Sequence, residues 1–189
     1  MSLYLGWDPP RPGWVCAECG FDYDATAPAA VGELLGGLVR EYHARLLADV
    51  ELLRAHPDPP TWSALEYACH VRDCLALYDW RIRKVLSERC PRLPQMRRDA
   101  VVVERAYNAA EPAVVAAEMA DNRARLAALL GEVSGADWHR VGVREGEEVS
   151  VTWMPINTLH EAHHHLMDVD RALDRSGPSD PHAHGRTAS

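Results

Sequence analysis

The chain has 189 residues and a mass of 21.0 kDa, the size of one domain with its own hydrophobic core. Its composition, 47% hydrophobic and 25% charged, is that of an ordinary globular protein. A net charge of −8 argues against nucleic acid or an anionic membrane surface as a partner, because basic patches hold both. Only 7% of residues are aromatic, and the apolar residues are mainly Ala, Leu and Val, which favours helices over sheets.

The N-terminal sequence MSLYLGWDPPRPGW lacks the basic start and the apolar run of a signal peptide, and no stretch approaches the length of a membrane span. Five cysteines in such a chain indicate reduced thiols, so we expect a cytoplasmic protein. Lys84 is the only lysine beside many arginines. With the abundance of alanine, this suggests a high-GC genome such as that of an actinobacterium.

Residues 1–27 are rich in Pro, Gly and Trp and show no helical period, so an irregular N-terminal segment is expected there. Apolar residues then recur every three or four positions from Val31 to Leu53, which predicts a helix with one buried face. The sequence HPDPP at 56–60 ends this helix.

The second helix has a well-defined start in TWSALEY. Ser63 can cap the helix while Glu66, three residues later, reaches back to it, which is a capping box. Trp62 and Tyr67 are placed to form the accompanying hydrophobic staple. We expect the helix to continue to about Cys90, just before a proline.

Further helices are expected at 98–107, at 112–130, and from Pro155 or Asn157 to about Gly177. Residues 136–152 contain alternating valines around an REGEE turn and indicate a loop or small hairpin. Long helices with short connections predict an all-α fold, a four-helix bundle over residues 28–176. A flexible tail is expected at 177–189.

Residues 160–169 read HEAHHHLMDV, and the first five letters fit the zinc-protease pattern H-E-x-x-H. A protease of this type needs a third ligand, either a later Glu or the longer pattern H-E-x-x-H-x-x-G-x-x-H. No Glu follows Glu161, and Met167 and Asp170 stand where Gly and His are required. The protease interpretation therefore lacks its third ligand on the C-terminal side.

His160 and His164 are four residues apart and share a helix face, as two ligands of one metal must. His163 and His165 point about 100° to either side of His164 and are expected at the surface or beside the site. His70, in the second helix, is the candidate third ligand, which leaves one coordination position open, as in catalytic zinc sites. Two simpler interpretations stay open: His70 packs in the core, and the histidine run is a solvated helix face.

The N-terminal segment contains VCAECG, in which Cys16 and Cys19 form a C-x2-C pair. This pair is compatible with half a zinc knuckle, a redox pair or two reduced cysteines in a loop. A structural zinc would need two more ligands, for which the sequence offers Cys90, or His182 and His184 in the tail.

The stretches TWSALEYACHVRD and LHEAHHHLMDV together resemble the DinB-like superfamily over roughly residues 30–175. This superfamily contains DinB/YfiT-like four-helix-bundle metalloproteins, among them bacterial thiol S-transferases and the mycothiol-dependent maleylpyruvate isomerase. The resemblance implies a divalent metal, zinc or nickel, bound by His70, His160 and His164. It also implies an unusual helix order and frequent homodimers.

Chemically, the resemblance implies a low-molecular-weight thiol held as a metal thiolate that attacks an electrophile, or a thiol adduct that is isomerised. In an actinobacterium, mycothiol is the natural thiol. Glu161, next to a ligand, and Asp73, one turn from His70, would be partners of the ligand histidines or proton carriers. Cys74, one turn from His70, has no assigned role, and Cys69 is expected to be a small buried residue.

We therefore expect a metal-dependent thiol transferase or isomerase whose partners are a small thiol and an electrophile. Two alternatives stay open. One is a non-catalytic protein of the same fold that binds a metal or a small ligand. The other is a metal-dependent hydrolase that uses metal-bound water, with Glu161 as the base.

Overall fold

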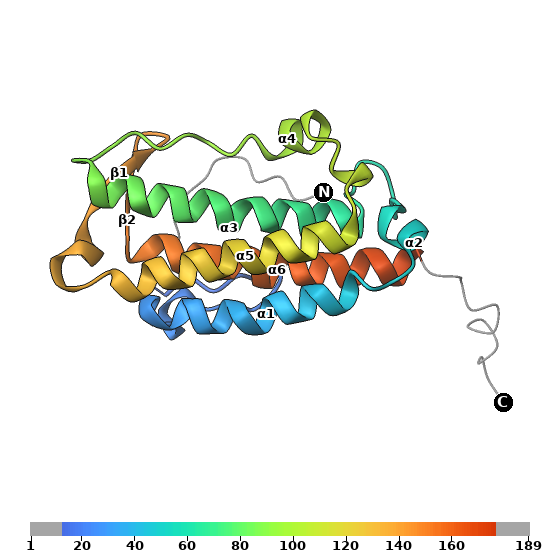
Figure 1. Cartoon of the computed structure of the whole chain (residues 1–189), viewed down its shortest axis with the longest axis horizontal. Helices are drawn as coiled ribbons and strands as arrows, with labels where there is room; N and C mark the ends of the chain where they lie inside the picture. Colours follow the sequence, from blue (N-terminus) through green and yellow to red (C-terminus); the bar gives the residue numbers. More distant parts are fainter. Residues whose placement is uncertain (1–12, 177–189) are drawn as a thin grey trace.

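The computed structural model describes residues 13–176, so the expected tail at 177–189 lies outside the described residues. Four long helices form a bundle (Figure 1): α1 (Val31–Arg45), α3 (Ala64–Ser87), α5 (Pro112–Glu132) and α6 (Trp153–Ser176). Helices α1 and α3 each pack against both α5 and α6. Helix α1 therefore lies diagonally opposite α3, and α5 lies diagonally opposite α6. The expected all-α four-helix bundle is confirmed.

The first predicted helix is divided in two. Helix α1 ends at Arg45, and a separate short helix, α2 (Val50–Arg54), follows. The carboxylate of Asp49 accepts a hydrogen bond from the backbone N–H of Glu51, which caps the start of α2. Leu46 and Leu53 are both buried. The apolar residues therefore face the core as predicted, but they belong to two helices and not to one.

Helix α3 begins as predicted and ends slightly earlier. The Ser63 hydroxyl accepts from the backbone N–H of Glu66, and the Glu66 carboxylate accepts from the backbone N–H of Ser63 at 2.8 Å. The rings of Trp62 and Tyr67 lie 5.4 Å apart, which is the expected staple. This cap fixes where α3 starts and hence the position of its early residues, including His70.

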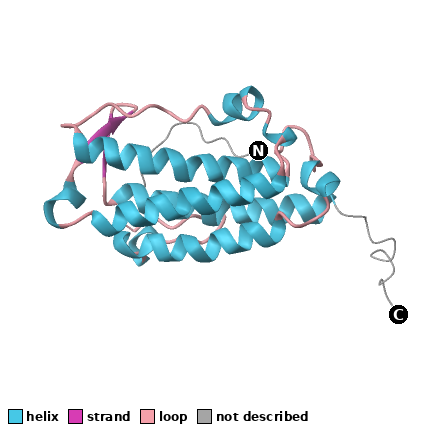
Figure 2. Ribbon diagram, in the orientation of Figure 1, coloured by secondary structure: helices cyan, strands magenta, loops and turns pink. Residues whose placement is uncertain are grey.

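Shorter elements complete the chain (Figure 2). Between α3 and α5 lies α4 (Arg98–Glu104), and before α6 comes a hairpin of β1 (Val141–Arg144) and β2 (Glu147–Ser150). The 3-10 segments are η1 (Tyr23–Ala25), η2 (Pro28–Ala30), η3 (Tyr107–Ala109) and η4 (Gly135–His139). The predicted small hairpin is thus present within residues 136–152.

The hairpin packs closely on the segment that follows α3. The backbone N–H of Leu93 donates to the carbonyl of Val143, and the N–H of Val143 donates to the carbonyl of Pro91, both at 2.8 Å. A Cβ at Gly142 would lie 2.9 Å from side-chain atoms of Leu93 and Val85, so any larger residue there would displace them. The hairpin and residues 91–96 therefore form one wall at this end of the bundle.

Polar contacts between α1 and α6 fix how α6 is rotated. The buried Tyr42 hydroxyl donates to the backbone carbonyl of Ala162 at 2.9 Å. Arg45 donates to the carboxylate of Asp170 at 2.8 Å. Within residues 13–176, no helix combines the length and the apolar character that crossing a membrane would require.

Candidate metal centre

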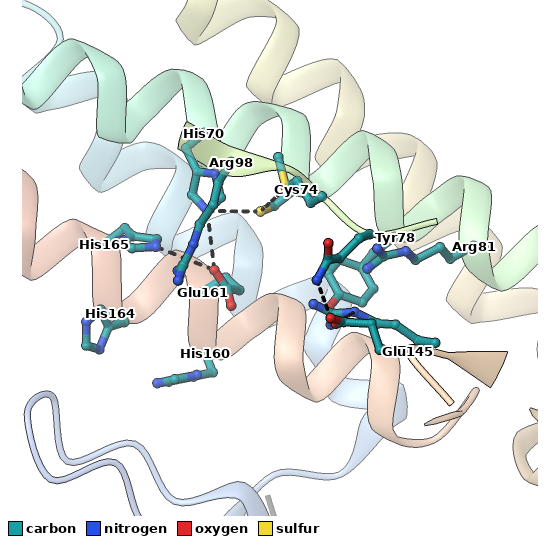
Figure 3. A pocket seen from close by; sticks show the side chains of 13 residues that line it. His70, Cys74, Tyr78, Arg81, Arg98, Glu145, His160, Glu161, His164 and His165 are labelled. Atoms are coloured by element: carbon teal, nitrogen blue, oxygen red, sulfur yellow. Dashed lines mark hydrogen bonds and ion pairs between the residues drawn. The ribbon is translucent and has the colours of Figure 1, made fainter. Parts of the chain in front are cut away.

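Helix α6 carries metal-binding side chains on two different faces. Figure 3 shows Glu161 and His165 pointing towards His70 on α3, whereas His160 and His164 lie to the other side. The donor atoms of His70, Glu161 and His165 lie within 4.8 Å of one another. We call these three residues the inner cluster. Glu161 and His165 are four residues apart, so one face of α6 presents both.

The spacing of the inner cluster fits a bound ion. Nε2 of His70 and Nε2 of His165 each lie 3.4 Å from Oε2 of Glu161. Two ligand atoms at the usual zinc distance of about 2.0–2.1 Å in a tetrahedral site are separated by roughly 3.4 Å. Two histidines and one glutamate, with a fourth position open, are a donor set known from catalytic zinc sites.

The charges around the inner cluster favour a cation there. Burial alone would raise the pKa of Glu161, but hydrogen bonds with His165 and His70 hold it well below its usual range. Burial alone would lower the pKa of His165, but hydrogen bonds with Asp168 and Glu161 raise it to about 9. The two carboxylates thus stabilise a positive charge between them, carried either by a proton on His165 or by an ion at its Nε2.

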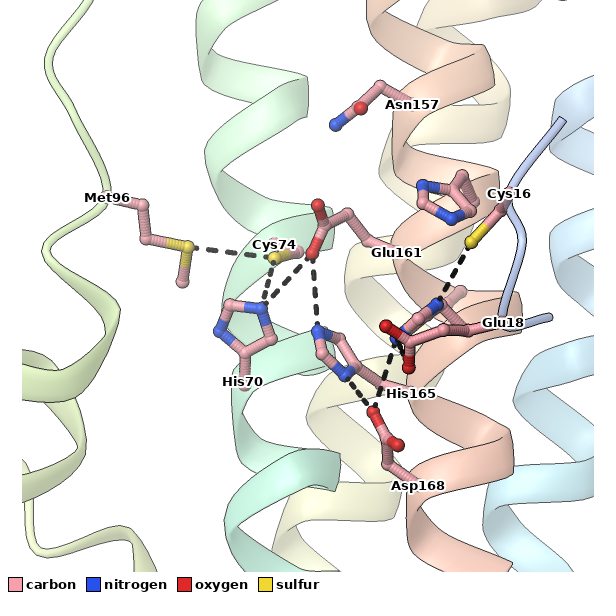
Figure 4. Close-up of polar contacts among 12 residues, drawn as sticks. Cys16, Glu18, His70, Cys74, Met96, Asn157, Glu161, His165 and Asp168 are labelled. Carbon is pink, nitrogen blue, oxygen red and sulfur yellow. Dashed lines mark hydrogen bonds and ion pairs between the residues drawn. The ribbon is translucent and has the colours of Figure 1, made fainter. Parts of the chain in front are cut away.

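Asp168 orients His165. Its Oδ2 lies 2.9 Å from Nδ1 of His165, and Figure 4 shows it on the far side of that ring from Glu161. A carboxylate on one ring nitrogen fixes the proton there and leaves the other nitrogen as the donor to a metal. His70 reaches the cluster through Nε2, and burial lowers its pKa, so its ring is neutral near pH 7.

The structure does not bring the three predicted ligands together. His70 joins the inner cluster, but His160 and His164 belong to a separate group with Cys16 and Cys19. In the described residues, the expected ligands His70, His160 and His164 thus lie in different groups of donor atoms, although all three line one cavity. One residue along a helix is a rotation of about 100°, and α6 is rotated so that Glu161 and His165 face α3.

Other expected roles change for similar reasons. Glu161, expected as a partner or base, lies in the inner cluster with His70, and His165, expected at the surface or beside the site, is 8% exposed in the same cluster. The carboxylate of Asp73 accepts hydrogen bonds from Arg72, Arg105 and Tyr107. These contacts occupy the Asp73 carboxylate, and among the described residues that line the cavity beside the inner cluster Asp73 is not found.

The two nearby cysteines of α3 are buried. The Sγ of Cys74 lies 3.4 Å from Nε2 of His70 and 3.6 Å from the Met96 sulfur. Burial, reinforced by the charge of Glu161, raises the pKa of Cys74 well above its ordinary value, which disfavours a thiolate. Cys69 is fully buried, as expected. Burial raises the pKa of Cys69 to about 12.

The inner cluster opens into a cavity of about 220 Å³. Its lining includes three arginines that sequence patterns did not single out: Arg81 from α3, Arg98 from α4 and Arg144 from β1. At its edge, the Gln95 side chain contacts the carboxylate of Glu145 and joins the segment after α3 to the hairpin turn. In a chain of net charge −8, such a concentration of arginine suits an anionic group.

The second group of donors lies between α6 and the N-terminal segment. The donor atoms of Cys16, Cys19, His160 and His164 lie within 4.8 Å of one another. We call these four residues the outer cluster. Cys90, considered as a partner of the cysteine pair, is exposed and belongs to no such group among residues 13–176, and the alternatives His182 and His184 lie outside the described residues.

Comparisons with known proteins agree with this fold. A family model described as the DinB superfamily matches residues 27–167. A comparison with curated proteins gave no match.

Two solved structures are similar to the chain. YfiT from Bacillus subtilis, described as "a probable metal-dependent hydrolase with an unusual four-helix bundle topology", is 16% identical with a TM-score of 0.69, over 90% of this chain and 95% of that one. A mycothiol-dependent maleylpyruvate isomerase is 15% identical with a TM-score of 0.62, over 78% of this chain. This chain covers 62% of that isomerase. At these identities the likeness shows a shared fold.

Proposed function

Because the chain belongs to the DinB superfamily, we propose that it is a metal-dependent enzyme whose ion is bound by His70, Glu161 and His165. We further propose that it acts with a low-molecular-weight thiol, as a transferase or an isomerase. The observation that carries the proposal is the inner cluster itself, two histidines and a glutamate at ligand spacing, open to a cavity lined by arginines.

An ion at this position would act as a Lewis acid and lower the pKa of a thiol or water at its open position, so that a nucleophile forms near neutral pH. The residues of the chain have the remaining tasks. Asp168 holds the proton on Nδ1 of His165 and directs Nε2 into the cluster. Glu161, as a ligand, contributes negative charge and is not available as a general base, which makes the expected hydrolase mechanism less favourable.

The cavity indicates the class of electrophile. Guanidinium groups bind carboxylates with paired hydrogen bonds, so we propose that Arg98 and Arg144 orient an acidic substrate beside the inner cluster, where Nε of Arg144 already lies 3.5 Å from the carboxylate of Glu145. Gln95 and Glu145, which contact each other, also line the cavity and join the segment after α3 to the hairpin turn. A small carboxylate-bearing electrophile, such as an α,β-unsaturated acid, fits these features. In an actinobacterial source the thiol would be mycothiol.

The test is consumption of an α,β-unsaturated carboxylate by the metal-loaded protein, with and without cysteine, glutathione or mycothiol. We expect turnover that requires both thiol and metal and that is lost in His165→Ala. His163→Ala is the matched control, since His163 is on the same helix but exposed. Equal turnover without any thiol would favour the hydrolase instead. A fully loaded protein that turns over no such pair would favour a non-catalytic binding protein.

A further inference from the structure

The outer cluster contains four metal-binding side chains that the proposed reaction does not use. We propose that Cys16, Cys19, His160 and His164 together bind one zinc ion in a closed, tetrahedral Cys2His2 centre that fastens the N-terminal segment to α6. Their donor atoms all lie within 4.8 Å of one another, although the cysteines and histidines are separated by more than 140 positions in the chain. The proposal is independent of the catalytic one, because it uses different ligands.

The two cysteines lie in a tight turn of the kind that zinc knuckles use. The backbone N–H of Gly20 donates to the carbonyl of Cys16 at 2.8 Å, and the N–H of Cys16 donates to the carbonyl of Phe21 at 2.9 Å. Gly20 has φ +72°, a left-handed conformation that glycine adopts without strain. The turn places both sulfurs beside α6, as the short C-x2-C spacing of structural zinc sites does.

A chain of hydrogen bonds fixes the protonation of His160. The amide nitrogen of Asn157 donates to the Tyr78 hydroxyl at 2.7 Å, which leaves the amide oxygen to accept from the Tyr23 hydroxyl at 2.9 Å. The Tyr23 hydroxyl therefore accepts from Nδ1–H of His160, 2.8 Å away. Nε2 of His160 is then the unprotonated nitrogen. It is buried and has no hydrogen-bond partner among residues 13–176.

An unpartnered, buried acceptor nitrogen is costly unless something binds it. Nε2 of His160 belongs to a side chain that is 5% exposed, in a cluster with two thiols and a second imidazole. A cation bound by these two thiols would also be coordinated by Nε2 of His160 and by the second imidazole, so that all four donor atoms would have a partner. Zinc prefers this mixture of sulfur and imidazole ligands.

His164 completes the donor set. Its Nδ1 lies 3.6 Å from the sulfur of Cys16. A zinc ion with usual bond lengths of about 2.3 Å to sulfur and 2.0–2.1 Å to nitrogen separates two tetrahedral ligands by roughly 3.5 Å. Nε2 of His164 points to the carboxylates of Asp168 and Glu18, at 3.6 and 3.9 Å, which is the carboxylate support found behind metal-bound histidines.

The surroundings suit a neutral, permanent centre. The rings of Trp14, Phe21 and Tyr23 lie 5.3–5.6 Å from that of His160, and Cys16 is buried. Two thiolates cancel the charge of the zinc ion, so the centre adds no net charge to this apolar setting. Four protein ligands also leave no open position, which distinguishes a structural zinc from a catalytic one.

The first test is the zinc content of the full chain purified under reducing conditions without chelator. We expect Cys16→Ser/Cys19→Ser to contain one zinc equivalent less than wild type. Cys90→Ser, which changes an exposed cysteine, should retain the wild-type content. His165→Ala should lose the inner metal but retain the outer zinc. Comparison of this variant with the double cysteine variant therefore distinguishes the two metals. Unchanged zinc content in the double cysteine variant would overturn the proposal.

A second measurement does not depend on how well the double variant folds. When cobalt replaces zinc in the wild-type chain, we expect thiolate-to-cobalt charge-transfer absorption and the intense visible bands of tetrahedral cobalt. The same spectrum should appear in His165→Ala, and a weakened one in His160→Ala. Absence of charge transfer in the wild type, or a Cys16–Cys19 disulfide in metal-free protein purified under reducing conditions, would overturn the proposal.

Discussion

On α6, each residue of the inner cluster directly follows a residue of the outer cluster: Glu161 follows His160, and His165 follows His164. The two clusters differ in the number of side chains that could bind a metal, and this number distinguishes catalytic from structural zinc sites. The inner cluster has three ligand-type side chains and opens into a cavity of about 220 Å³. The outer cluster has four, shared between α6 and the N-terminal segment, and its two histidines also line that cavity. One helix thus presents two sets of metal-binding side chains, because one residue along the helix is a rotation of about 100°.

Asp168 is where the two clusters meet. Its Oδ2 lies 2.9 Å from Nδ1 of His165 and 3.6 Å from Nε2 of His164, so one carboxylate supports a histidine of each cluster. The two clusters therefore have different metal-binding side chains but share the carboxylate of Asp168. Variants of each cluster should separate two phenotypes, loss of turnover and loss of stability, while variants of Asp168 should affect both.

The largest expected effect is loss of turnover on removal of an inner ligand. His165→Ala should lower kcat/KM by more than about 100-fold, because loss of even a residue that supports a metal ligand costs roughly 10–100-fold. The melting temperature of His165→Ala should stay close to that of the wild type. Steady-state kinetics and thermal unfolding of the same preparation check both expectations. Full activity in His165→Ala, with His163→Ala as control, would exclude the inner cluster as the active centre.

Loss of the outer cluster should act mainly on stability. Cys16→Ser/Cys19→Ser should lower the melting temperature by roughly 10 °C, since the free energy of structural metal binding is folding free energy. In a domain of this size, 1 kcal/mol corresponds to about 2–4 °C. Differential scanning calorimetry with and without a chelator measures the effect. An equal melting temperature for wild type and variant, each unaffected by the chelator, would contradict this assignment.

An intermediate effect is expected at the shared carboxylate. Asp168→Asn keeps the size of the side chain but removes the charge that supports His165 and His164. Metal affinity of the inner cluster should fall about 10-fold or more, with a smaller loss at the outer one. Competition with a chromophoric chelator gives both affinities, and the exposed Asp174→Asn on the same helix is the control. If Asp168→Asn bound metal at both clusters with the wild-type affinities, Asp168 would support neither cluster.

The smallest effect concerns substrate binding. Arg98→Gln should raise KM for a carboxylate substrate about 10-fold and leave kcat and metal content nearly unchanged, since it removes one charge-assisted contact. Arg97→Gln is the adjacent control, because Arg97 is exposed and forms an ion pair with Glu104 at the surface. A fall in kcat at constant KM would place Arg98 in the reaction itself.

The fold was predictable because its signals are local. The capping box of Ser63 and Glu66, the apolar spacing and the turn residues each depend on near neighbours in the chain, and α3, α5 and α6 lie close to where they were expected. The break before α2 was missed because two helices facing one core keep the same apolar spacing as a single longer helix.

The site was predictable only in part. HEAHHH contains two pairs at helical spacing, His160 with His164 and Glu161 with His165, and spacing favours neither. The choice depends on the rotation of α6, which its contacts with α1 and α3 determine. The partnership of Cys16 with His164, and the meeting of three arginines from different elements, arise from tertiary structure and have no local signal.

The most direct test is a crystal structure of the metal-loaded chain with anomalous scattering measured at the zinc absorption edge. The account predicts two separate peaks, one among His70, Glu161 and His165, and one among Cys16, Cys19, His160 and His164. A single peak bounded by His70, His160 and His164 would contradict it. That result would restore the grouping expected from sequence and leave the cysteines without a metal.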